Sequence, residues 1–582
     1  MLDTKIIGGT IVDGTGAPGF SGDIGIRDGR IVAIGRVEED AGTVIDATGR
    51  IVAPGFIDAH THYDAQVFWD PALSPSCYHG VTTVIGGFCG FSIAPLTPES
   101  APYIRRMLSR VEGMPLETLE AVSDWNWSSF GDYLDRVEGR VGINAGFFVG
   151  HSAIRRAAMG PRAVGEKATP DELAAMVQLL DRSLAEGALG FSTTTSPTHS
   201  DYEGQPVPSR WADREEFLTL ARVVARHEGA GLEMLPDLAF PEGTPELLAD
   251  FSVAGQRPVN WNVLVVSGRK DADAMAARQL AASDLARARG GEVIALTMPR
   301  TPGVYMTLKS GMMFDALPGL WGELFRRPPA KREAAFRDPA DRRKLAADAA
   351  GMPESAPLKP FADFASYTVV STIAAANREY EGRTIGDIAA QEGREPIDVM
   401  LDIALSDDLG TIFAPDQGGH DRAAWEIRGR LWADDRTLVG ASDAGAHLDL
   451  IDSFDYATTV LAQGVREQRL ISLEEAIYQI TARPAAYFGL VDRGAIRVGN
   501  HADLVVFDLA TVASRPMGRR HDLPGNAAAY RIYAEAEGID RILVNGIEIV
   551  RSGEHTGALP GRLLRSGRDT RTVPMDVMRK RP

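Results

Sequence analysis

The stretch GFIDAHTHYD, residues 55–64, ends an apolar run with two histidines separated by one residue, His60 and His62. Side chains at positions i and i+2 of a β-strand point to the same side, so the two imidazoles are expected to project together. Neutral imidazoles bind zinc and similar divalent metals. Chance gives about 0.2 His-x-His pairs in a chain with this histidine content, so coincidence is the alternative. The spacing and the apolar run before it predict half of a metal site.

Two further segments carry side chains suited to the same site. Asp443, in SDAGAH at 442–447, could bind the metal, accept a proton from water, or do both; a helix N-cap is the alternative. Cys89, in GGFCGFS at 86–92, is flanked by glycines that let the backbone approach closely. A thiolate is a strong zinc ligand and could bridge two ions. A plain buried cysteine is the alternative reading of Cys89.

The elements that would position these residues are apolar, strand-like runs, most of them followed by a plausible helix. The runs span 55–60, 81–87, 143–150, 188–193, 229–235, 258–266, 291–297 and 437–443. Eight β/α repeats predict an α/β protein with a parallel (β/α)8 TIM barrel, whose catalytic groups lie at the C-terminal ends of the strands. The eighth strand of a closed barrel lies beside the first, so Asp443 is expected to face His60 and His62.

One helix is marked with particular clarity. Thr169-Pro170-Asp171-Glu172 supplies an N-cap, a proline at the first helical position and a capping-box acid. An apolar stripe follows, and Gly187 is expected to end the helix. The stripe consists of Leu173, Met176, Val177, Leu180 and Leu184.

The two ends of the chain read as short strands and turns, and neither end has enough strands to bury a sheet face alone. We predict a small β-sandwich domain built from both ends, residues 1–54 plus 485–560, beside a barrel of residues 55–484. Residues from about 300 to 430 are too long for a single loop and are expected to form a helical insertion. Residues 561–582 are expected to form a C-terminal tail.

The composition is that of an ordinary globular protein, with 44% hydrophobic and 24% charged residues and a net charge of -18. The negative charge disfavours a phosphate-binding surface and an anionic membrane. The basic segment 326–348 is therefore interpreted as a solvated helical surface, with a nucleic-acid patch as the alternative. No apolar run approaches the roughly 18 residues of a membrane span. We expect a small-molecule substrate, no nucleic acid and no membrane; the subunit number stays open, a homo-oligomer included.

The cysteine content and the N-terminal residues bear on the compartment. The chain has only two cysteines, Cys77 and Cys89, which excludes a disulfide scaffold and fits a reducing environment. The first residues, MLDTKIIGG, lack the charged and apolar regions of a signal peptide. We expect a cytoplasmic protein.

Five segments, in this order, resemble the D-aminoacylase branch of the amidohydrolase superfamily: GFIDAHTHYD, GGFCGFSIAPL, VGHSAIR, GALGFSTTT and GASDAGAH. VDGTG and RVGNHADLVVFD are similar to the composite β domain of that superfamily. The resemblance covers nearly the whole chain outside 265–430. It implies a distorted (β/α)8 barrel with a zinc site that hydrolyses N-acyl-D-amino acids. It also implies that His60, His62 and Asp443 bind one metal and that Cys89 is shared with a second.

The sequence departs from the family pattern at strands five and six, where the resemblance implies one histidine each. Strand five has Glu233 and Met234 instead, and strand six has Asn260 and Asn262. We therefore expect the second metal position to be missing or weakened, leaving a single strongly bound Zn2+ or other divalent ion per chain. Whether Glu233 replaces a histidine ligand stays open.

The segment after Asp443 also differs, because it lacks the arginine with which relatives hold the substrate carboxylate. Acidic residues stand there instead and are expected to repel a carboxylate. They are Asp449, Asp452 and Asp455.

The predicted function is a metal-dependent hydrolase that cleaves an amide C–N bond of an N-acyl-(D-)amino acid or a related amide. A bound ion keeps an open position for water and lowers its pKa towards ~7, and Asp443 acts as general base and acid. His151 and His447 are candidate donors to the oxyanion, with structural roles as the alternative. Tyr305 and Arg300 are candidate substrate contacts. The alternative functions are an amidohydrolase acting on a cyclic amide, carbamate or ester, and a catalytically inactive binding protein.

Overall fold

The computed structural model describes residues 1–581 except 123, 124, 310–312, 326, 328, 354, 355 and 357, and omits the side chains of 329 and 330. The chain forms two compact units. The first comprises Met1–Arg300, His420–Leu448 and the residues from Ser453 onward, and the second comprises Thr301–Gly419 and Asp449–Asp452. All of the metal-ligand candidates lie in the first unit.

The first unit contains parallel strands that are hydrogen-bonded in the order β6–β7–β8 and β9–β10–β11–β12–β13–β16. Each of the eight apolar runs contains a strand, so the strand predictions are confirmed. The third run is divided by Phe148 into β8 and β9. A parallel bridge between Thr61 and Ala444 joins the residues that follow β6 to those that follow β16. The strands are β6 (Phe56–Asp58), β7 (Val81–Gly86), β8 (Asn144–Phe147), β9 (Val149–Gly150), β10 (Gly190–Thr194), β11 (Gly231–Leu235), β12 (Val259–Leu264), β13 (Val293–Thr297) and β16 (Thr437–Val439).

Helices follow most of these strands, as the alternating pattern predicts. The helix α5 begins after Thr169, whose side chain accepts from the Glu172 backbone N–H in a capping box. Its buried residues include Met176, Leu180 and Leu184, which confirms the predicted apolar stripe. The helices are α1 (Ala101–Val111), α4 (His151–Met159), α5 (Pro170–Ala185), α6 (Arg214–Val224), α7 (Thr244–Gly255), α8 (Ala272–Ala288), α14 (Arg422–Ala433), α16 (Leu473–Ile480) and α17 (Ala482–Phe488).

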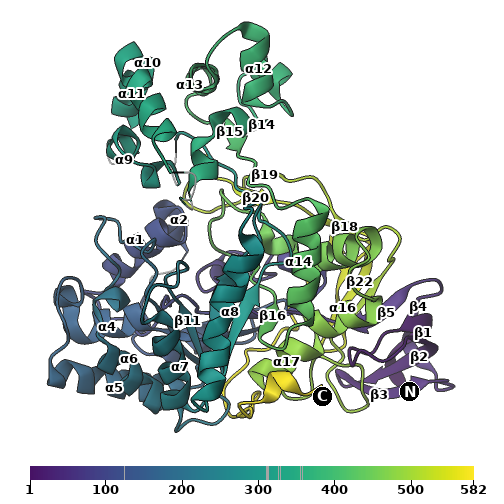
Figure 1. The fold of residues 1–582 in the computed structure, drawn as a ribbon. Helices are drawn as coiled ribbons and strands as arrows, with labels where there is room; N and C mark the ends of the chain where they lie inside the picture. The colour runs from purple at the N-terminus through teal and green to yellow at the C-terminus, as the bar shows by residue number, and fades with distance from the viewer. Residues whose placement is uncertain are drawn as a thin grey trace. The chain divides into compact units, whose positions relative to one another are not determined.

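Strands from both chain ends form one sheet of nine strands, in the order β24–β23–β22–β17–β5–β1–β2–β3, with β4 paired to β1. Figure 1 shows the purple N-terminal strands beside the yellow-green strand β22. A core of aliphatic side chains from both ends, Ile6, Ile24 and Leu504 among them, holds the sheet together. Its strands are β1 (Leu2–Ile11), β2 (Phe20–Arg27), β3 (Arg30–Gly35), β4 (Ala41–Asp46), β5 (Ile51–Pro54), β17 (Leu504–Phe507), β22 (Ile539–Val544), β23 (Ile547–Arg551) and β24 (Glu554–His555).

The C-terminal residues pack onto the parallel strands. Leu564 and Met578 belong to the same buried cluster as Ile57 of β6 and Ile294 of β13. The Leu564 backbone N–H also donates to the carbonyl of Ala145 in β8 at 2.8 Å. The segment predicted as a tail therefore contributes buried side chains to the core around these strands.

The second unit carries its own helices and core, as the length of this region predicts. Its buried cluster includes Trp321, Phe336 and Phe364. The basic segment 326–348 contributes to α10 and α11, and Arg342 pairs there with Asp398 at 3.1 Å. The elements are α9 (Leu320–Phe325), α10 (Pro329–Arg337), α11 (Pro339–Ala350), β14 (Thr368–Ser371), α12 (Ile385–Glu392), α13 (Pro396–Ser406) and β15 (Ile412–Ala414).

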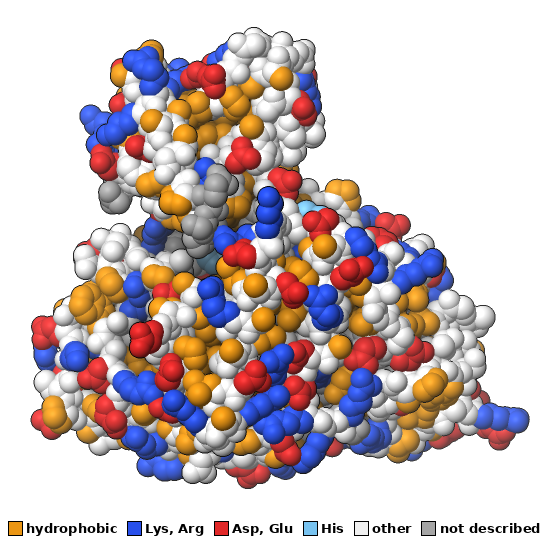
Figure 2. Space-filling view, in the orientation of Figure 1, with side chains coloured by type: hydrophobic (Ala, Val, Ile, Leu, Met, Phe, Trp, Pro, Cys, Tyr) orange, Lys and Arg blue, Asp and Glu red, His pale blue; other side chains and the backbone are white. Residues whose placement is uncertain are grey.

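Figure 2 shows acidic and basic side chains interspersed over the face in view. Among the described residues, no helix has both the length and the apolar character needed to cross a bilayer.

Candidate metal centre

The two histidines of the opening motif follow β6, after a bend at residues 59 and 60. The Thr61 N–H between them donates to the Ile85 carbonyl of β7 at 2.9 Å, and the His62 N–H donates to the Ala444 carbonyl at 2.7 Å. This pairing on both sides holds the segment in place, and both imidazoles project toward Asp443. Their ring centroids are 5.1 Å apart, and both side chains are buried. The predicted pairing of His60 with His62 is confirmed.

Asp443 reaches this pair from the residues after β16. Its N–H donates to the His60 carbonyl at 3.1 Å. Its Oδ1 lies 3.0 Å from His62 Nε2 and 3.4 Å from His60 Nε2. The expectation that the end of the eighth strand faces the first is therefore confirmed in its geometry.

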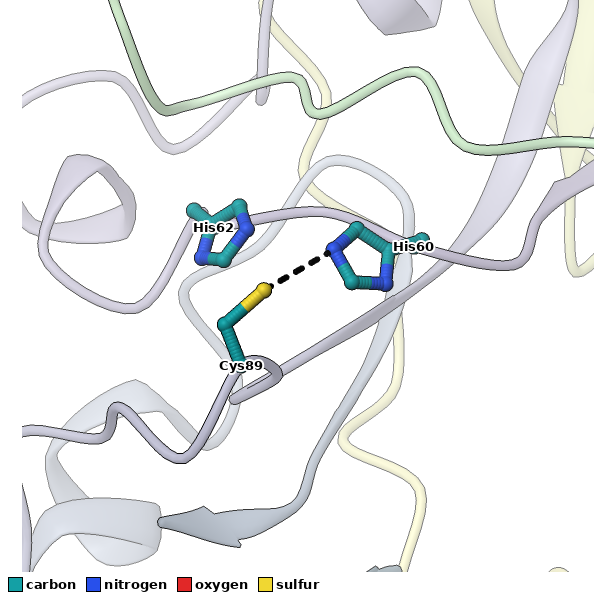
Figure 3. Close-up of side chains that lie close together, drawn as sticks. All are labelled: His60, His62 and Cys89. Atoms are coloured by element: carbon teal, nitrogen blue, oxygen red, sulfur yellow. Dashed lines mark hydrogen bonds between the residues drawn. The ribbon is translucent and has the colours of Figure 1, made fainter. Parts of the chain in front are cut away.

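Cys89 approaches from the loop after β7 and completes a group of possible metal donors. Its Sγ lies 3.7 Å from His60 Nε2, and the donor atoms of His60, His62 and Cys89 all lie within 4.8 Å of one another. Figure 3 shows the thiol directed toward the two imidazoles. Cys89 has a φ of 57°, a left-handed conformation that non-glycine residues adopt with strain.

The charges of this cluster favour a cation. Partial burial acts to raise the pKa of Asp443, but its contacts with His60 and His62 outweigh burial and hold that pKa well below its ordinary value. Burial lowers the pKa of His60, which keeps this imidazole neutral. Burial also acts to lower the pKa of His62, yet Glu112 and Asp443 raise it well above its ordinary value. A positive charge is thus stabilised where a divalent ion would bind.

Glu112, which the sequence analysis missed, is a buried carboxylate next to His62. Its Oε2 lies 3.4 Å from His62 Nδ1, and its backbone carbonyl accepts from the His447 N–H. Burial raises the pKa of Glu112 to about 7, while the His62 imidazole acts to lower it. Glu112 follows directly after helix α1, and no local sequence pattern distinguishes it from an ordinary surface acid.

Strands five and six contribute Glu233 and Asn262, at the positions where the family resemblance implies histidines. Glu233 Oε2 accepts from the Cys89 N–H at 3.1 Å. Asn262 Nδ2 lies 3.3 Å from Cys89 Sγ and 3.4 Å from His60 Nε2. Within the described chain, Glu233 Oε1 and Asn262 Oδ1 are buried and have no hydrogen-bond partner. Burial raises the pKa of Glu233 well above its ordinary value.

His151, a predicted substrate contact, lies in a buried polar network. Its Nδ1 is 2.9 Å from Thr193 Oγ1 and its Nε2 is 2.8 Å from Glu216 Oε1. Arg155 donates to both carboxylate oxygens of Glu216, at 3.0 and 3.1 Å. Both ring nitrogens of His151 are therefore occupied by protein groups, which favours the structural alternative for this residue.

His447 borders the cluster, with Nε2 3.9 Å from Asp443 Oδ2. Its Nδ1 is buried and has no partner among the residues that the structure describes. The side chains of Asp443 and His447 are 23% and 20% exposed, whereas His60 and His62 are almost fully buried. Solvent therefore reaches the cluster on the side of Asp443 and His447.

His199 also belongs to this region and was missed, although the polar loop at 193–211 that contains it has the composition of a site-lining segment. Its ring centroid is 4.9 Å from that of Phe91. Burial lowers the pKa of His199 to about 3, and the imidazoles of His447 and His62 act in the same direction.

Two other residues that were predicted to contact the substrate form hydrogen bonds or ion pairs with protein groups. Tyr305 lies in the second unit, where its hydroxyl donates to Asp452 Oδ2 at 2.9 Å. Arg300 pairs with Asp455 at 3.0 Å. Asp452 and Asp455, which the sequence analysis treated as groups repelling a carboxylate, are thus engaged in hydrogen bonds or ion pairs.

The donor set fits a divalent metal. Zinc binds histidine nitrogen, thiolate sulfur and carboxylate oxygen, and all three types are present in His60, His62, Cys89 and Asp443. The unpartnered buried oxygens of Glu233 and Asn262 lie on residues that contact the same cluster.

Comparisons with known proteins identify the family of this chain. A profile of the amidohydrolase family matches residues 43–312 and 355–546. The N-acyl-D-glutamate deacylase of Alcaligenes xylosoxydans xylosoxydans is 31% identical over 584 aligned residues, covering 97% of this chain and 96% of the relative.

Two solved structures are similar over nearly the whole chain. One is a crystal structure of D-aminoacylase, with a TM-score of 0.65, and the other is the N-acyl-D-glutamate deacylase of Bordetella bronchiseptica complexed with zinc and a phosphonate inhibitor, with a TM-score of 0.62. Each is 28% identical, and each match covers 97% of this chain and 100% of the other. The fold is thus an amidohydrolase TIM barrel with a small additional domain. The chain belongs to the amidohydrolase family, in its D-aminoacylase branch.

Proposed function

We propose that this chain is a metal-dependent hydrolase that cleaves the amide C–N bond of N-acyl-D-amino acids. The proposal depends mainly on one observation. Asp443 Oδ1, after β16, lies 3.0 Å from His62 Nε2 and 3.4 Å from His60 Nε2, both of which follow β6. Relatives named N-acyl-D-glutamate deacylase and D-aminoacylase support the substrate class.

The metal would be held by His60, His62 and Asp443, with Cys89 close to both imidazoles. A divalent ion bound there supplies a Lewis acid that polarises the scissile carbonyl and increases the acidity of water. The nitrogen and sulfur donors support Zn2+, the ion named with the Bordetella relative. We propose a single strongly bound ion per chain, because imidazoles are absent from β11 and β12.

Asp443 moves the proton. Its carboxylate is ionised at neutral pH, because the imidazole contacts hold its pKa well below the ordinary value. It accepts a proton from the attacking water as the C–O bond forms. It then gives this proton to the departing nitrogen as the C–N bond breaks, so that the products are a carboxylic acid and an amine.

His447 is the proposed substrate contact. His447 Nε2 borders Asp443 at 3.9 Å and lies on the exposed side of the cluster, where it can donate to the developing oxyanion. The Tyr305 hydroxyl already donates to Asp452 within the second unit, so we assign no substrate contact to Tyr305. Because both nitrogens of His151 are occupied, we assign no substrate contact to it.

The test is hydrolysis of matched N-acetyl-D- and N-acetyl-L-amino acids by Zn2+-loaded protein, with hydantoins and simple esters as competing substrate classes. We expect release of the free D-amino acid and none from chelator-treated protein. Hydrolysis confined to cyclic amides or esters would overturn the substrate class. Zinc binding without hydrolysis of any of these compounds would favour the inactive binding protein.

We also propose boundaries for the domains of the chain. Residues 1–54 and 485–560 form a small β-sandwich domain. Residues 55–484 form a distorted barrel with a helical insertion at about 300–430, and residues 561–582 form a C-terminal tail. The sheet that joins strands from both chain ends supports the composite domain. The two-cysteine content supports a cytoplasmic location, and a homo-oligomer is compatible with all of these features.

A further inference from the structure

Asn262 lies on β12, beside His60 and Cys89 of the candidate donor cluster. Its Nδ2 is 3.3 Å from Cys89 Sγ and 3.4 Å from His60 Nε2. The residue is 5% exposed, so its amide has little access to water. Asn262 is therefore as close to two potential metal donors as these donors are to each other.

The side-chain oxygen of Asn262, Oδ1, accepts no hydrogen bond from the described residues. This oxygen is also buried. Buried polar atoms are paired as a rule, so an unpaired oxygen beside a metal site indicates a missing partner. The nitrogen and oxygen of an asparagine amide have almost the same shape, and half a turn about the Cβ–Cγ bond exchanges them.

The exchanged orientation places an oxygen next to a thiol sulfur and an imidazole nitrogen. The lone pairs of three such atoms repel one another unless a proton or a cation lies among them, and a single thiol proton can relieve only one of the three contacts. Zinc–ligand bonds of 2.0–2.3 Å set neighbouring donors of a tetrahedral site about 3.3–3.8 Å apart. The Asn262–Cys89, Asn262–His60 and Cys89–His60 distances are 3.3, 3.4 and 3.7 Å, which fall in this range.

We propose that Asn262 is a metal ligand of this chain, whose side-chain oxygen binds the ion together with His60 and Cys89. This inference rests on the proposed metal-dependent function and adds a donor to its site. An amide oxygen is a harder donor than the imidazole that the family resemblance implies at this strand. Replacement of Asn262 by histidine should therefore shift the preference of the site toward Zn2+ and away from Mn2+.

The experiment measures metal binding by metal-free protein, with Zn2+ competed against a chromophoric chelator and Co2+ followed by its visible spectrum. Asn262→Leu removes the oxygen with little change in size, and we expect Zn2+ affinity to fall about 10- to 100-fold with a changed Co2+ spectrum. The matched control is Asn260→Leu, which removes a buried amide from the same strand. We expect this control to bind Zn2+ like the wild type.

A second variant keeps the test valid if Asn262→Leu does not fold, which circular dichroism and thermal unfolding in EDTA will reveal. Asn262→Asp retains the shape and adds a negative charge to the donor, so we expect it to bind Zn2+ at least about tenfold more tightly than the wild type. Wild-type affinity and an unchanged Co2+ spectrum in both the Leu and Asp variants would overturn the inference.

The variant His62→Ala separates this inference from the proposed function. If His62→Ala loses Zn2+ while Asn262→Leu retains it, only the role of Asn262 is wrong. If the wild type and His62→Ala bind Zn2+ equally weakly, the metal-dependent function itself is wrong.

Discussion

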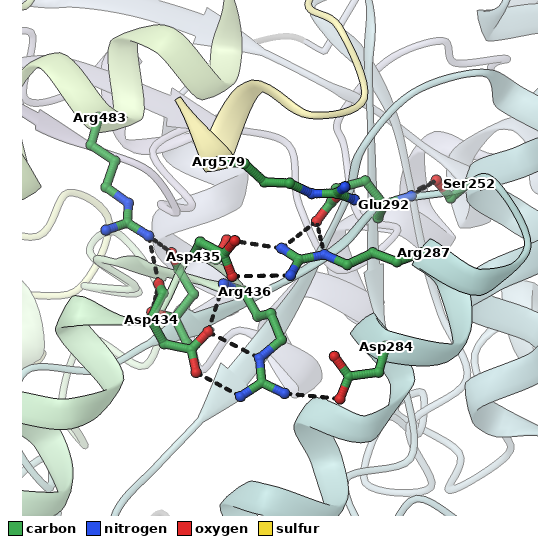
Figure 4. Close-up of polar contacts among 10 residues, drawn as sticks. Ser252, Asp284, Arg287, Glu292, Asp434, Asp435, Arg436, Arg483 and Arg579 are labelled. Carbon is green, nitrogen blue, oxygen red and sulfur yellow. Dashed lines mark hydrogen bonds and ion pairs between the residues drawn. The ribbon is translucent and has the colours of Figure 1, made fainter. Parts of the chain in front are cut away.

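The two ends of the parallel strands satisfy their polar groups in opposite ways. At the C-terminal ends, His60, Cys89 and Asp443 crowd together, and the described residues provide no partner for Glu233 Oε1 or for Asn262 Oδ1. At the N-terminal ends of β13 and β16, acids and arginines are paired with one another (Figure 4). The acids are Asp284, Glu292, Asp434 and Asp435, and the arginines are Arg287, Arg436, Arg483 and Arg579.

The paired cluster has balanced charge and dense hydrogen bonding. Arg436 contacts Asp434 at 2.6 Å and Asp284 at 2.9 Å. Arg287 contacts Glu292 at 2.8 Å and Asp435 at 3.0 Å. Arg579, from the C-terminal segment, also contacts Glu292. This cluster ties α8, β13, β16 and the C-terminus together, so its role is stability.

The comparison shows at which end of the strands polar groups remain available to bind a ligand. At the N-terminal ends, the carboxylates of Glu292, Asp434 and Asp435 are each paired with an arginine. Groups at the C-terminal ends are close, buried and incompletely paired, as expected of a site that is completed by a ligand. Substitutions at the C-terminal ends should therefore change function, and substitutions at the N-terminal ends should change stability.

The largest effect is expected for Asp443→Asn. The amide retains the shape of the side chain but cannot accept the proton from water. We expect kcat to fall by about 10²- to 10⁴-fold, with a thermal unfolding midpoint close to that of the wild type. Steady-state kinetics on an N-acyl-D-amino acid and thermal unfolding measure the two quantities. Wild-type kcat would remove Asp443 from the mechanism.

The opposite outcome is expected for Glu292→Ala at the other end. The Glu292 side chain is 0% exposed and contacts both Arg287 and Arg579. Because removal leaves two arginines without their shared carboxylate, we expect a loss of about 2–4 kcal/mol in the free energy of unfolding. Urea denaturation measures this loss. The kcat of the folded protein should stay unchanged, and a large fall in kcat would contradict the separation of the two ends.

A smaller functional effect is expected for Glu112→Gln. The loss of the negative charge beside His62 Nδ1, 3.4 Å away, removes the group that orients and polarises this imidazole. We expect Zn2+ affinity to fall by about 10- to 100-fold, as measured by chelator competition. Glu117→Gln is the control, because Glu117 is exposed. Equal affinity in both variants would exclude a role of Glu112 in metal binding.

The smallest effect concerns the pH dependence of stability through Glu233. Its pKa is raised well above the ordinary value in the folded protein, because burial disfavours the charged carboxylate. The folded state therefore binds the proton more tightly than the unfolded state, and this contribution is present below the unfolded pKa of about 4.3 and is lost as pH rises.

We expect Glu233→Gln to reduce this loss of stability in metal-free protein. The measurement is the thermal unfolding midpoint from pH 4 upward in EDTA, and the difference between the wild-type and variant curves isolates Glu233 from other buried acids. Parallel curves would show that Glu233 is not a neutral buried acid in the folded protein.

Local features were accessible from the sequence. The i, i+2 spacing of His60 and His62 places both rings on one side because strand geometry alone sets that direction. The eight apolar runs and the capping box at Thr169 likewise depend on neighbouring residues, and the structure contains the corresponding strands and helix. The proximity of Asp443 followed from one topological assumption, the closure of the barrel.

Only the tertiary structure decided which other residues meet at this site. Glu112 follows an ordinary amphipathic helix, His199 lies in a polar loop, and Asn262 is one of two asparagines on its strand. Their roles depend on contacts between segments far apart in the chain, which no local periodicity records. The sequence by itself determined the strands, one well-capped helix and the paired imidazoles, because short-range geometry governs them. Packing between distant segments decided what surrounds the imidazoles and which charges are left unpaired.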